Sequence, residues 1–235
     1  MSDKRNTLAP AQPLNILVAC EESQVVTIEL RRRGHRAFSC DILDCSGDHP
    51  QWHIKQDVIP LLGGNCEFTT CDGKRHAVHG RWDMIIAFPP CTYLTNAGAR
   101  HLWKGHVLNQ ERYQKGLEAK AFFMQFYHAP CDRIVIENPT PSRIYDLPKP
   151  SQTIQPWQFG HPFTKRTNLW EIGVPPLTPT DIVEPTRTWC PSGSYSKRHG
   201  EQHRGMFTTD RARNRSKTFP GIAAAMAEQW TERVI

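Results

Sequence analysis

The residue best placed to do chemistry is a cysteine that follows two prolines. Cys91 comes directly after Pro89 and Pro90, which follow the apolar run 84–88. Two prolines form a stiff turn, and such a turn would hold a thiol at the end of a strand with few conformations to lose. A thiol held in this way can act as a nucleophile. The alternative is a buried cysteine that serves as a small apolar side chain, the more frequent role of a single cysteine.

A carboxyl group and an amide end a later apolar run. Glu137 closes the run 133–137, and Asn138 follows it. Ligands of open α/β sheets bind beyond the carboxyl ends of the strands, so Glu137 is expected near Cys91. The position of Cys91 at a strand end and this second motif together favour the nucleophile over the buried cysteine.

Acidic residues also follow the first strands. Asp41 ends the segment 37–41, and Asp57 comes after a further short segment. A carboxylate at the end of the second strand suits the hydroxyl groups of a ribose, and Asp57 could accept a hydrogen bond from an adenine amino group. Acidic residues after strands are common, so a purely structural role is the alternative for each of them.

The elements that must position these residues can be predicted from hydrophobic patterning. The continuous apolar runs 15–20, 84–88 and 133–137 are typical of strands buried on both faces of a parallel sheet. Between the first run and the segment 37–41 lies a predicted crossover helix, which makes one βαβ unit. The alternation predicts an α/β fold with a mainly parallel, doubly wound sheet.

Three helices are predicted around this sheet. The crossover helix is expected at 25–33, with Ser23 as its N-cap and Gly34 at its end, and the other two at 110–128 and 222–230. The prolines crowded between 139 and 179 predict loops and short strands rather than a second helical layer.

The composition predicts a soluble protein with one main domain. The chain has 235 residues, and its mean hydropathy is −0.56. No apolar run approaches the roughly 18 residues of a membrane span, so no membrane partner is expected. The polar residues 1–13 are predicted to be a flexible tail without a secretory signal, and the eight cysteines lie in unlike contexts. These features favour a reducing cytosol.

A basic run near the end of the chain predicts contact with nucleic acid. Between Ser196 and Lys217, seven Lys or Arg stand against two acidic residues, which makes the local charge +5. Such a run is usually a solvated surface, but it would also neutralise phosphates. We expect it to contact DNA or RNA. The expected contacts in the run are Lys197, Arg198, Arg204, Arg211, Arg213 and Arg215.

The motifs together resemble those of the cytosine-C5 DNA methyltransferases. The Pro-Cys motif of that family, with Ser or Thr and Ala-Gly after it, is matched by Pro90-Cys91, Thr95 and Ala97-Gly98. The Glu-Asn motif is matched by Glu137-Asn138, and the order of the motifs agrees. The chain looks like the small phage-type members. The resemblance implies a Rossmann-like methyltransferase fold, the cofactor S-adenosylmethionine, and methylation of C5 of cytosine in DNA.

The resemblance also assigns roles to the matched residues. Cys91, with Pro90 before it, would add to C6 of the cytosine ring, which makes C5 reactive toward a methyl group. Glu137 would protonate or hydrogen-bond N3 of the ring, and Asn138 would brace the loop of Cys91. The DNA would be single-stranded, or double-stranded with the target base flipped out of the stack to reach Cys91 and Glu137.

The same resemblance places the cofactor at the first strands. The family has a glycine-rich turn after its first strand, whereas this chain has Cys20-Glu21-Glu22-Ser23. Glu21 or Glu22 would pair with the amino group of the methionine part, and N–H groups of the helix that starts near Ser23 would bind its carboxylate. The expected cofactor-binding residues are Ala19, Cys20, Glu21, Glu22, Ser23, Asp41, Ile42, Asp57, Val58 and Pro89.

The segment 163–170 resembles the Gln-x-Arg-x-Arg strand of the family. Arg166 matches the first arginine, and Asn168 stands where the second would be. Arg166, Lys165 or Asn168 would contact the carbonyl oxygen of the cytosine, and Thr95 is a further expected substrate contact. The alternative is a set of basic residues on a solvent-facing strand.

These assignments divide the chain into four parts. They are the tail (1–13), a catalytic core (14–170), a short basic region that contacts substrate (171–217) and a terminal helix that returns to the core (218–235). The basic region has room for little more than a loop. We therefore expect little or short sequence specificity, with binding led by phosphate contacts.

Several alternatives stay open. The spacing of Cys66, Cys71, His76 and His79 could bind zinc, but it matches no established pattern, and no metal is expected. The substrate could be a free cytosine nucleotide, or the cofactor a modified S-adenosylmethionine. An amino-methyltransferase is disfavoured by Phe88 and Cys91 at positions where those enzymes have other residues. A catalytically inactive DNA-binding protein is disfavoured by the presence of both Cys91 and Glu137.

Overall fold

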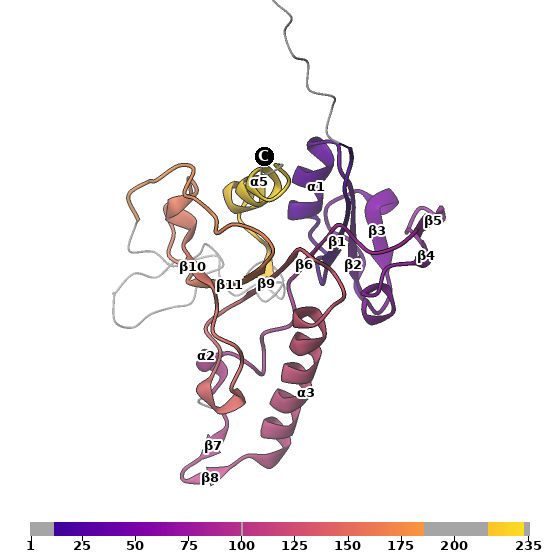
Figure 1. Ribbon diagram of the computed structural model, residues 1–235. Coiled ribbons are helices and arrows are strands. Elements are labelled where there is room, and N and C mark those ends of the chain that lie inside the picture. Colours follow the sequence, from indigo (N-terminus) through magenta and orange to yellow (C-terminus); the bar gives the residue numbers. More distant parts are fainter. Residues whose placement is uncertain (1–11, 100, 186–215, 233–235) are drawn as a thin grey trace, which may run out of the picture.

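Continuous apolar runs form the middle of a seven-stranded sheet (Figure 1). The structure, a computed structural model, describes residues 12–99, 101–185 and 216–232. The strand order is β10-β11-β9-β6-β1-β2-β3. The strands are β1 (Asn15–Ala19), β2 (Arg36–Asp41), β3 (His53–Lys55), β6 (Met84–Ala87), β9 (Ile134–Asn138), β10 (Gln152–Ile154) and β11 (Thr167–Ile172). The three predicted apolar runs became β1, β6 and β9, each within one or two residues of its expected bounds.

The order of the strands places a switch point beside β1. The neighbours β3, β2, β1, β6 and β9 are parallel, and only β11 runs against its neighbours β9 and β10. From β1 the chain first builds outward to β2 and β3, then crosses to the other side of β1 to form β6 and β9. Between β1 and β6 the order reverses, which is where open α/β sheets bind ligands at their carboxyl edge. The predicted α/β class with a mainly parallel sheet is confirmed.

Helices cover both faces of the sheet. Successive residues of a strand point to opposite faces. Ile16 and Val18 of β1 therefore pack with α1 (Val25–Arg32) and α5 (Pro220–Gln229), whereas Leu17 packs with α3 (Gln110–Tyr127). Figure 1 shows α1 and α5 side by side on one face and α3 on the other. All three predicted helices are present.

Short elements lie outside the sheet. The region 59–81, which lacks periodicity, forms a 3-10 turn and the hairpin β4–β5, and a second hairpin, β7–β8, lies between the short α2 and α3. Their bounds are Cys66–Thr69 for β4, Arg75–Val78 for β5, Asn96–Ala99 for α2, Trp103–Lys104 for β7 and Val107–Leu108 for β8. The 3-10 turns are η1 (Pro50–Trp52), η2 (Ile59–Leu61), η3 (Arg143–Tyr145) and η4 (Pro156–Gln158). In the described part of the chain no helix is long and apolar enough to cross a membrane.

The expected division of the chain needs one adjustment. The boundary predicted at residue 170 falls inside β11, which continues to Ile172. The residues after it also belong to the core, because Leu177 is buried and Trp230 donates a hydrogen bond from Nε1 to the Pro175 carbonyl oxygen at 2.9 Å. The described part of the predicted basic region, up to residue 185, thus begins by packing against α5.

Candidate active site at the carboxyl edge of the sheet

The loop after β6 holds Cys91 next to the switch point. Phe88, the first residue after β6, donates its backbone N–H to the Ala19 carbonyl oxygen at 2.9 Å, which ties the loop to the end of β1. The carbonyl oxygen of Cys91 accepts from the N–H groups of Leu94 at 3.1 Å and Thr95 at 3.0 Å. Cys91 therefore begins a tight turn, and its side chain is partly exposed at the edge where ligands bind.

Asn138 joins this loop to the end of β9. Its side chain is fully buried, and Nδ2 donates to the Pro89 carbonyl oxygen at 2.9 Å. This is the contact expected of a residue that braces the Cys91 loop. Since Pro89 lies two residues before Cys91, the hydrogen bond places the two sequence motifs against each other.

Main-chain hydrogen bonds connect the two loops further along. Ser142 N–H donates to the Leu94 carbonyl oxygen at 2.7 Å, and Asn96 N–H donates to that of Thr140 at 2.9 Å. Between them Thr95 forms a β-bridge with Pro141. The Oγ1 atom of Thr95, an expected substrate contact, accepts from Gly98 N–H at 3.1 Å and so supports the first turn of α2.

Glu137 is the carboxyl group of this edge. It lies in β9 and is partly buried. Burial raises the pKa of its carboxyl, and the nearby Lys165 ammonium opposes that rise. A carboxyl with a raised pKa keeps its proton to higher pH and can donate it. The charge of Lys165, a second predicted site residue, thus acts on Glu137.

The structure places Asn168 inside the sheet. Asn168 lies in β11 opposite Asn138, and only 2% of its surface is exposed. Its Oδ1 atom accepts from the Thr153 hydroxyl at 2.8 Å, and Nδ2 lies 3.4 Å from Thr140 Oγ1. These contacts inside the sheet favour a structural role for Asn168 over a contact with a substrate carbonyl. Arg166 is exposed and Lys165 partly buried, and the charge of Lys165 acts on Glu137.

The turn after β1 takes a conformation that usually requires glycine. Cys20 has a φ of 59°, in the left-handed region, and its N–H donates to the Cys40 carbonyl oxygen at 2.7 Å. Burial raises the pKa of the Cys20 thiol, with further contributions from Asp41, Cys40 and Asp57. The backbone thus makes the tight turn without the family's glycines, at the steric cost of a side chain in this region.

One expectation for the start of α1 was wrong. Gln24, not Ser23, is the N-cap residue, with a φ of 58° and no side-chain cap of its own. The Glu21 carboxylate caps the helix instead, since it accepts from Val26 N–H at 2.6 Å, Thr27 N–H at 3.3 Å and the Thr27 hydroxyl at 2.7 Å. Two of the N–H groups expected for a ligand carboxylate, those of Val26 and Thr27, therefore already have a partner. The Glu21 carboxylate is engaged in capping, which leaves Glu22 as the better candidate to pair with an ammonium group.

Burial has a strong effect on the Glu21 carboxyl. Only 4% of the Glu21 surface is exposed. Burial raises its pKa to about 7, although the hydrogen bonds from Thr27 and Val26 act in the opposite direction. This carboxyl therefore titrates near neutrality inside the protein.

The ends of β2 and β3 provide an acidic and apolar surface. Asp41 Oδ1 accepts from Leu43 N–H at 2.9 Å, and burial raises the pKa of Asp41. Ile42, between them, has 71% of its surface exposed. Asp57 is exposed, with Oδ1 accepting from Ile59 N–H at 3.1 Å. The side chains of Ala19, Val58 and Pro89, also expected at the cofactor, lie in the interior.

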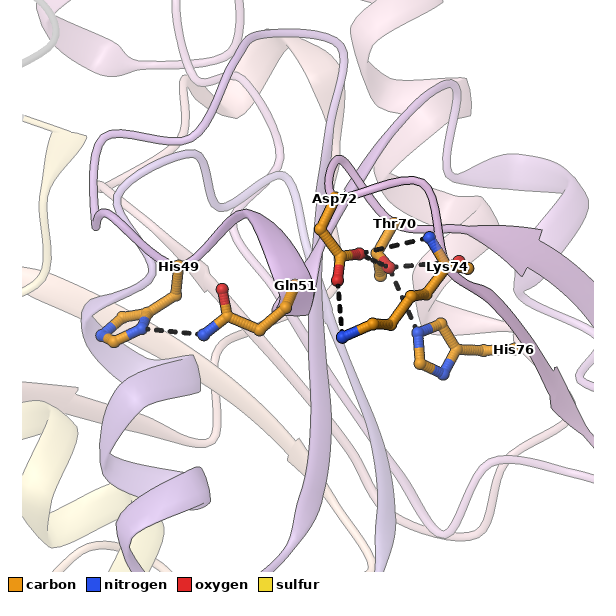
Figure 2. Close-up of polar contacts among 6 residues, drawn as sticks. All are labelled: His49, Gln51, Thr70, Asp72, Lys74 and His76. Carbon is orange, nitrogen blue, oxygen red and sulfur yellow. Dashed lines mark hydrogen bonds and ion pairs between the residues drawn. The ribbon is translucent and has the colours of Figure 1, made fainter.

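The structure does not gather the four residues with zinc-like spacing. Cys66 and His76 lie on the two strands of the β4–β5 hairpin, where Cys66 pairs with Val78 and His76 with Phe68. Figure 2 shows that His76 instead contacts Thr70, with Nε2 3.1 Å from Oγ1. Among the described residues, no group of three or more His, Cys, Asp or Glu side chains could hold a metal ion.

The same view explains the hairpin turn. Thr70 donates its hydroxyl to Asp72 Oδ1 at 2.6 Å, and Asp72 Oδ2 pairs with Lys74 Nζ at 3.2 Å (Figure 2). Gln51 Nε2 lies 3.2 Å from His49 Nδ1 on the other side of the view. These contacts stabilise a β-turn and its surroundings, so they account for the polar residues of the hairpin without a ligand.

Sequence reasoning missed one feature of this edge. Gln24, Ser39 and His53 are fully buried and polar, and they lie beside the loops that carry the expected cofactor residues. A serine inside the apolar strand 37–41 was the signal available in the sequence. The basic run expected to contact DNA (Lys197, Arg198, Arg204, Arg211, Arg213 and Arg215) lies outside the described residues.

Comparisons of the chain with protein-family models and with curated proteins returned no match. The function therefore has to be argued from the geometry of this edge.

Proposed function

We propose that this protein transfers a methyl group from S-adenosylmethionine to C5 of cytosine in DNA. The observation that carries the proposal is the hydrogen bond from Asn138 Nδ2 to the Pro89 carbonyl oxygen. It joins the cysteine loop to the strand of Glu137 at the switch point of the sheet. A nucleophile and a carboxyl group that can donate a proton then face one ligand-binding edge.

Cys91 is the nucleophile in this proposal. Cytosine C5 reacts poorly with an electrophilic methyl group until a thiolate adds to C6 and makes C5 electron-rich. The tight turn that starts at Cys91 and the main-chain bridge between Thr95 and Pro141 support this role, because they limit the positions of the thiol. After C5 has received the methyl group, a water molecule takes the C5 proton, Glu137 takes back the N3 proton, and the thiolate leaves C6, which restores the aromatic ring.

Glu137 supplies the proton at N3. Addition of the thiolate places negative charge on the ring nitrogen, and a protonated carboxyl at N3 neutralises that charge. The raised pKa of Glu137 supports this role. The Lys165 ammonium, whose charge acts on Glu137, is the proposed contact of the neighbouring carbonyl oxygen of the cytosine.

The ends of β1, β2 and β3 fit the cofactor. When bound there, S-adenosylmethionine supplies an electrophilic methyl group. Asp41 suits the ribose hydroxyls, the exposed Ile42 suits one face of the adenine ring, and Glu22 suits the ammonium group. Asp57 lies close enough to Cys20 to affect its pKa and is exposed, which suits an adenine amino group. DNA is the proposed polymer because of the +5 basic run, which would bind phosphates.

A covalent trap tests the proposal. The protein is incubated with labelled S-adenosylmethionine and DNA that contains 5-fluorocytosine, from which the C5 substituent cannot leave as a proton does. Wild type is expected to form a stable adduct with DNA, and Cys91→Ser to lose turnover by about four orders of magnitude or more. Cys71→Ser is the matched control, since Cys71 is an exposed cysteine on the β4–β5 hairpin.

The outcomes separate the alternatives. An adduct that persists in Cys91→Ser would remove Cys91 as the nucleophile. If wild type forms no adduct and labels no cytosine-containing DNA, the polymer substrate is excluded, and the same assay with cytosine mononucleotides decides the free-nucleotide alternative. Binding to DNA without either reaction would mark a catalytically inactive DNA-binding protein.

A further inference from the structure

The cofactor end holds three buried polar side chains that the proposed reaction does not use. Gln24, Ser39 and His53 are each 0% exposed. They come from the turn before α1, from β2 and from β3. A buried polar group destabilises the fold unless it is hydrogen-bonded. The hydrogen bonds of these three side chains therefore help to fix the backbone groups that they contact.

His53 connects a strand to a loop of the candidate cofactor site. Ser39 and His53 are neighbours in the β2–β3 register, and Ser39 Oγ lies 2.9 Å from His53 Nδ1. The other ring nitrogen, Nε2, lies 2.9 Å from the Leu43 carbonyl oxygen. Because a carbonyl oxygen only accepts, Nε2 carries the proton, and in the neutral ring Nδ1 accepts from the Ser39 hydroxyl. Ser39 Oγ also lies 3.3 Å from the Trp52 carbonyl oxygen.

Gln24 extends the network to a second loop. Its Nε2 atom donates to Ser39 Oγ at 3.2 Å and to the His49 carbonyl oxygen at 2.9 Å, and its Oε1 atom accepts from His49 N–H at 3.1 Å. A Cβ atom added to Gly47 would lie 2.7 Å from Gln24 Cβ, so the 45–49 loop packs directly on this side chain. The turn after β1 and the 45–49 loop are thereby held together.

The backbone of Leu43 connects this hydrogen-bond network to the proposed ribose site. Its carbonyl oxygen accepts from His53, and its N–H donates to Asp41 Oδ1 at 2.9 Å. Ile42, whose side chain is 71% exposed, lies between Asp41 and Leu43 in the chain. Loss of the His53 contact would release one end of this short loop while the strand before it stays paired.

We propose that His53 is a positioning residue for the adenosyl part of the cofactor, and that it acts through the backbone of Leu43 on Asp41 and Ile42. The inference rests on the proposed function, since it assumes that the ends of β1 and β2 bind an adenosyl group. His53 touches neither cofactor nor substrate in this role, and the contact that matters is the one made by Nε2.

Two substitutions separate the two ring nitrogens. Asparagine places its terminal polar atoms near the position of Nδ1, and glutamine places them near that of Nε2. His53→Asn should therefore lose the contact with Leu43, whereas His53→Gln should keep it. We expect the dissociation constant for S-adenosylhomocysteine, measured by calorimetry, to rise by about tenfold in His53→Asn and by less than about threefold in His53→Gln.

Kinetics and exchange distinguish positioning from a merely structural role. In His53→Asn the KM for S-adenosylmethionine should rise while kcat and the KM for DNA stay unchanged, and amide exchange in residues 41–49 should become faster. Each variant loses one of two hydrogen bonds, so both should lose similar thermal stability. A cofactor affinity that follows stability in the two variants, with no difference between them, overturns the inference.

The remaining outcomes also decide the question. Absence of S-adenosylhomocysteine binding by the wild type would overturn the proposed function and this inference with it, whereas binding that His53→Asn fully retains would overturn the inference alone. If His53→Asn does not fold, nitrogen chemical shifts of the wild-type His53 ring provide the test. The Nε2–H tautomer supports the role, and the Nδ1–H tautomer contradicts it.

Discussion

The two ends of the candidate site are built in different ways. At the cofactor end, the buried side chains of Gln24, Ser39 and His53 connect the loops, and Cys20 and Gln24 hold left-handed conformations. At the nucleophile end, main-chain hydrogen bonds connect the loops, and Asn138 is the buried side chain that ties them at Pro89. Substitutions at the first end should therefore change stability and cofactor affinity, whereas those at the second should mainly change the reaction rate.

After Cys91→Ser, the largest effect is expected from Glu137→Gln, which tests whether the nucleophile end controls rate. The amide can occupy the same space but cannot give up a proton, so kcat should fall by about 10²- to 10⁴-fold. Because burial raises the pKa of Glu137, the wild-type rate should decline as pH rises through that pKa, and the variant should lack this decline. Single-turnover rates across pH measure both effects.

Glu171→Gln is the matched control for that prediction. Glu171 is also a β-strand carboxyl whose pKa is raised by burial, but its Oε2 atom accepts from the Ser151 hydroxyl at 2.8 Å, away from the two motif loops. Its substitution should leave the rate and its pH profile unchanged. An equal loss in both variants would mean that the rate responds to any buried carboxyl, and the assigned role of Glu137 would be wrong.

Glu21→Gln tests whether the cofactor end controls stability. The folded protein raises the pKa of Glu21 from 4.5 to about 7, so the folded state binds a proton that the unfolded state has lost between those values. This contribution is fully present below pH 4.5 and is lost as pH rises to 7, by about 3 kcal/mol. Urea unfolding from pH 4.5 to 8 should show this decline in wild type but not in Glu21→Gln.

Glu22→Gln serves as the comparison for Glu21. Glu22 lies beside Glu21 in the same turn, and its charge contributes to the raised pKa of Asp41. Its substitution should leave the decline of stability between pH 4.5 and 7 in place. A variant of Glu21 that still shows the full decline would assign the titration to another group.

Asn138→Ala should affect both properties, because Asn138 is the one described side chain that ties the Pro89 carbonyl to β9. Loss of the hydrogen bond should lower the free energy of unfolding by about 1–3 kcal/mol and also reduce the single-turnover rate. Asn168→Ala is the control, since Asn168 is the buried neighbour of Asn138 in the sheet and is also hydrogen-bonded. It should lose comparable stability with no loss of rate. Equal rates in the two folded variants would contradict the bracing role.

The smallest effect is expected at Cys20. Glycine adopts a φ of 59° without steric cost, so Cys20→Gly should change the free energy of unfolding by no more than about 1 kcal/mol in either direction. Cys20→Val places a β-branched side chain in the same conformation and should destabilise the protein clearly more. Denaturant midpoints of the two variants measure the difference, and a valine variant as stable as the glycine variant would show that the turn is unstrained.

The sequence predicted the sheet better than the loops, for a physical reason. The runs that became β1, β6 and β9 are apolar at every position, since both faces of a central parallel strand are buried. Helices at 25–33 and 110–128 were within one residue of α1 and α3, because caps and apolar spacing act locally. These features depend on neighbours within a few positions of the chain.

The candidate site was harder to predict, because its contacts join distant positions. The motif predicted Asn168 as a substrate contact, but in the structure it lies inside the sheet, opposite Asn138 and hydrogen-bonded to Thr153. Serine is a common N-cap residue, which favoured Ser23, but the Glu21 carboxylate accepts the hydrogen bond from Val26 N–H at the start of the helix. No pattern in the sequence pointed to His53, because its hydrogen-bond partners lie ten and fourteen residues away in the chain. Strand register and turn conformation, which set these contacts, are not encoded in any local pattern.

The position of α5 has a consequence for how the protein is made. One face of the sheet, including Ile16, Val18 and Ile86, is covered by α1 together with Ile222 and Met226 of α5. The last strand of that sheet ends at Ile172, well before α5 begins at Pro220. During synthesis the strands therefore leave the ribosome before the helix that covers them, and an apolar surface stays open to chaperones or to aggregation until α5 emerges. Chains that stop before Pro220 should need a chaperone to remain dispersed.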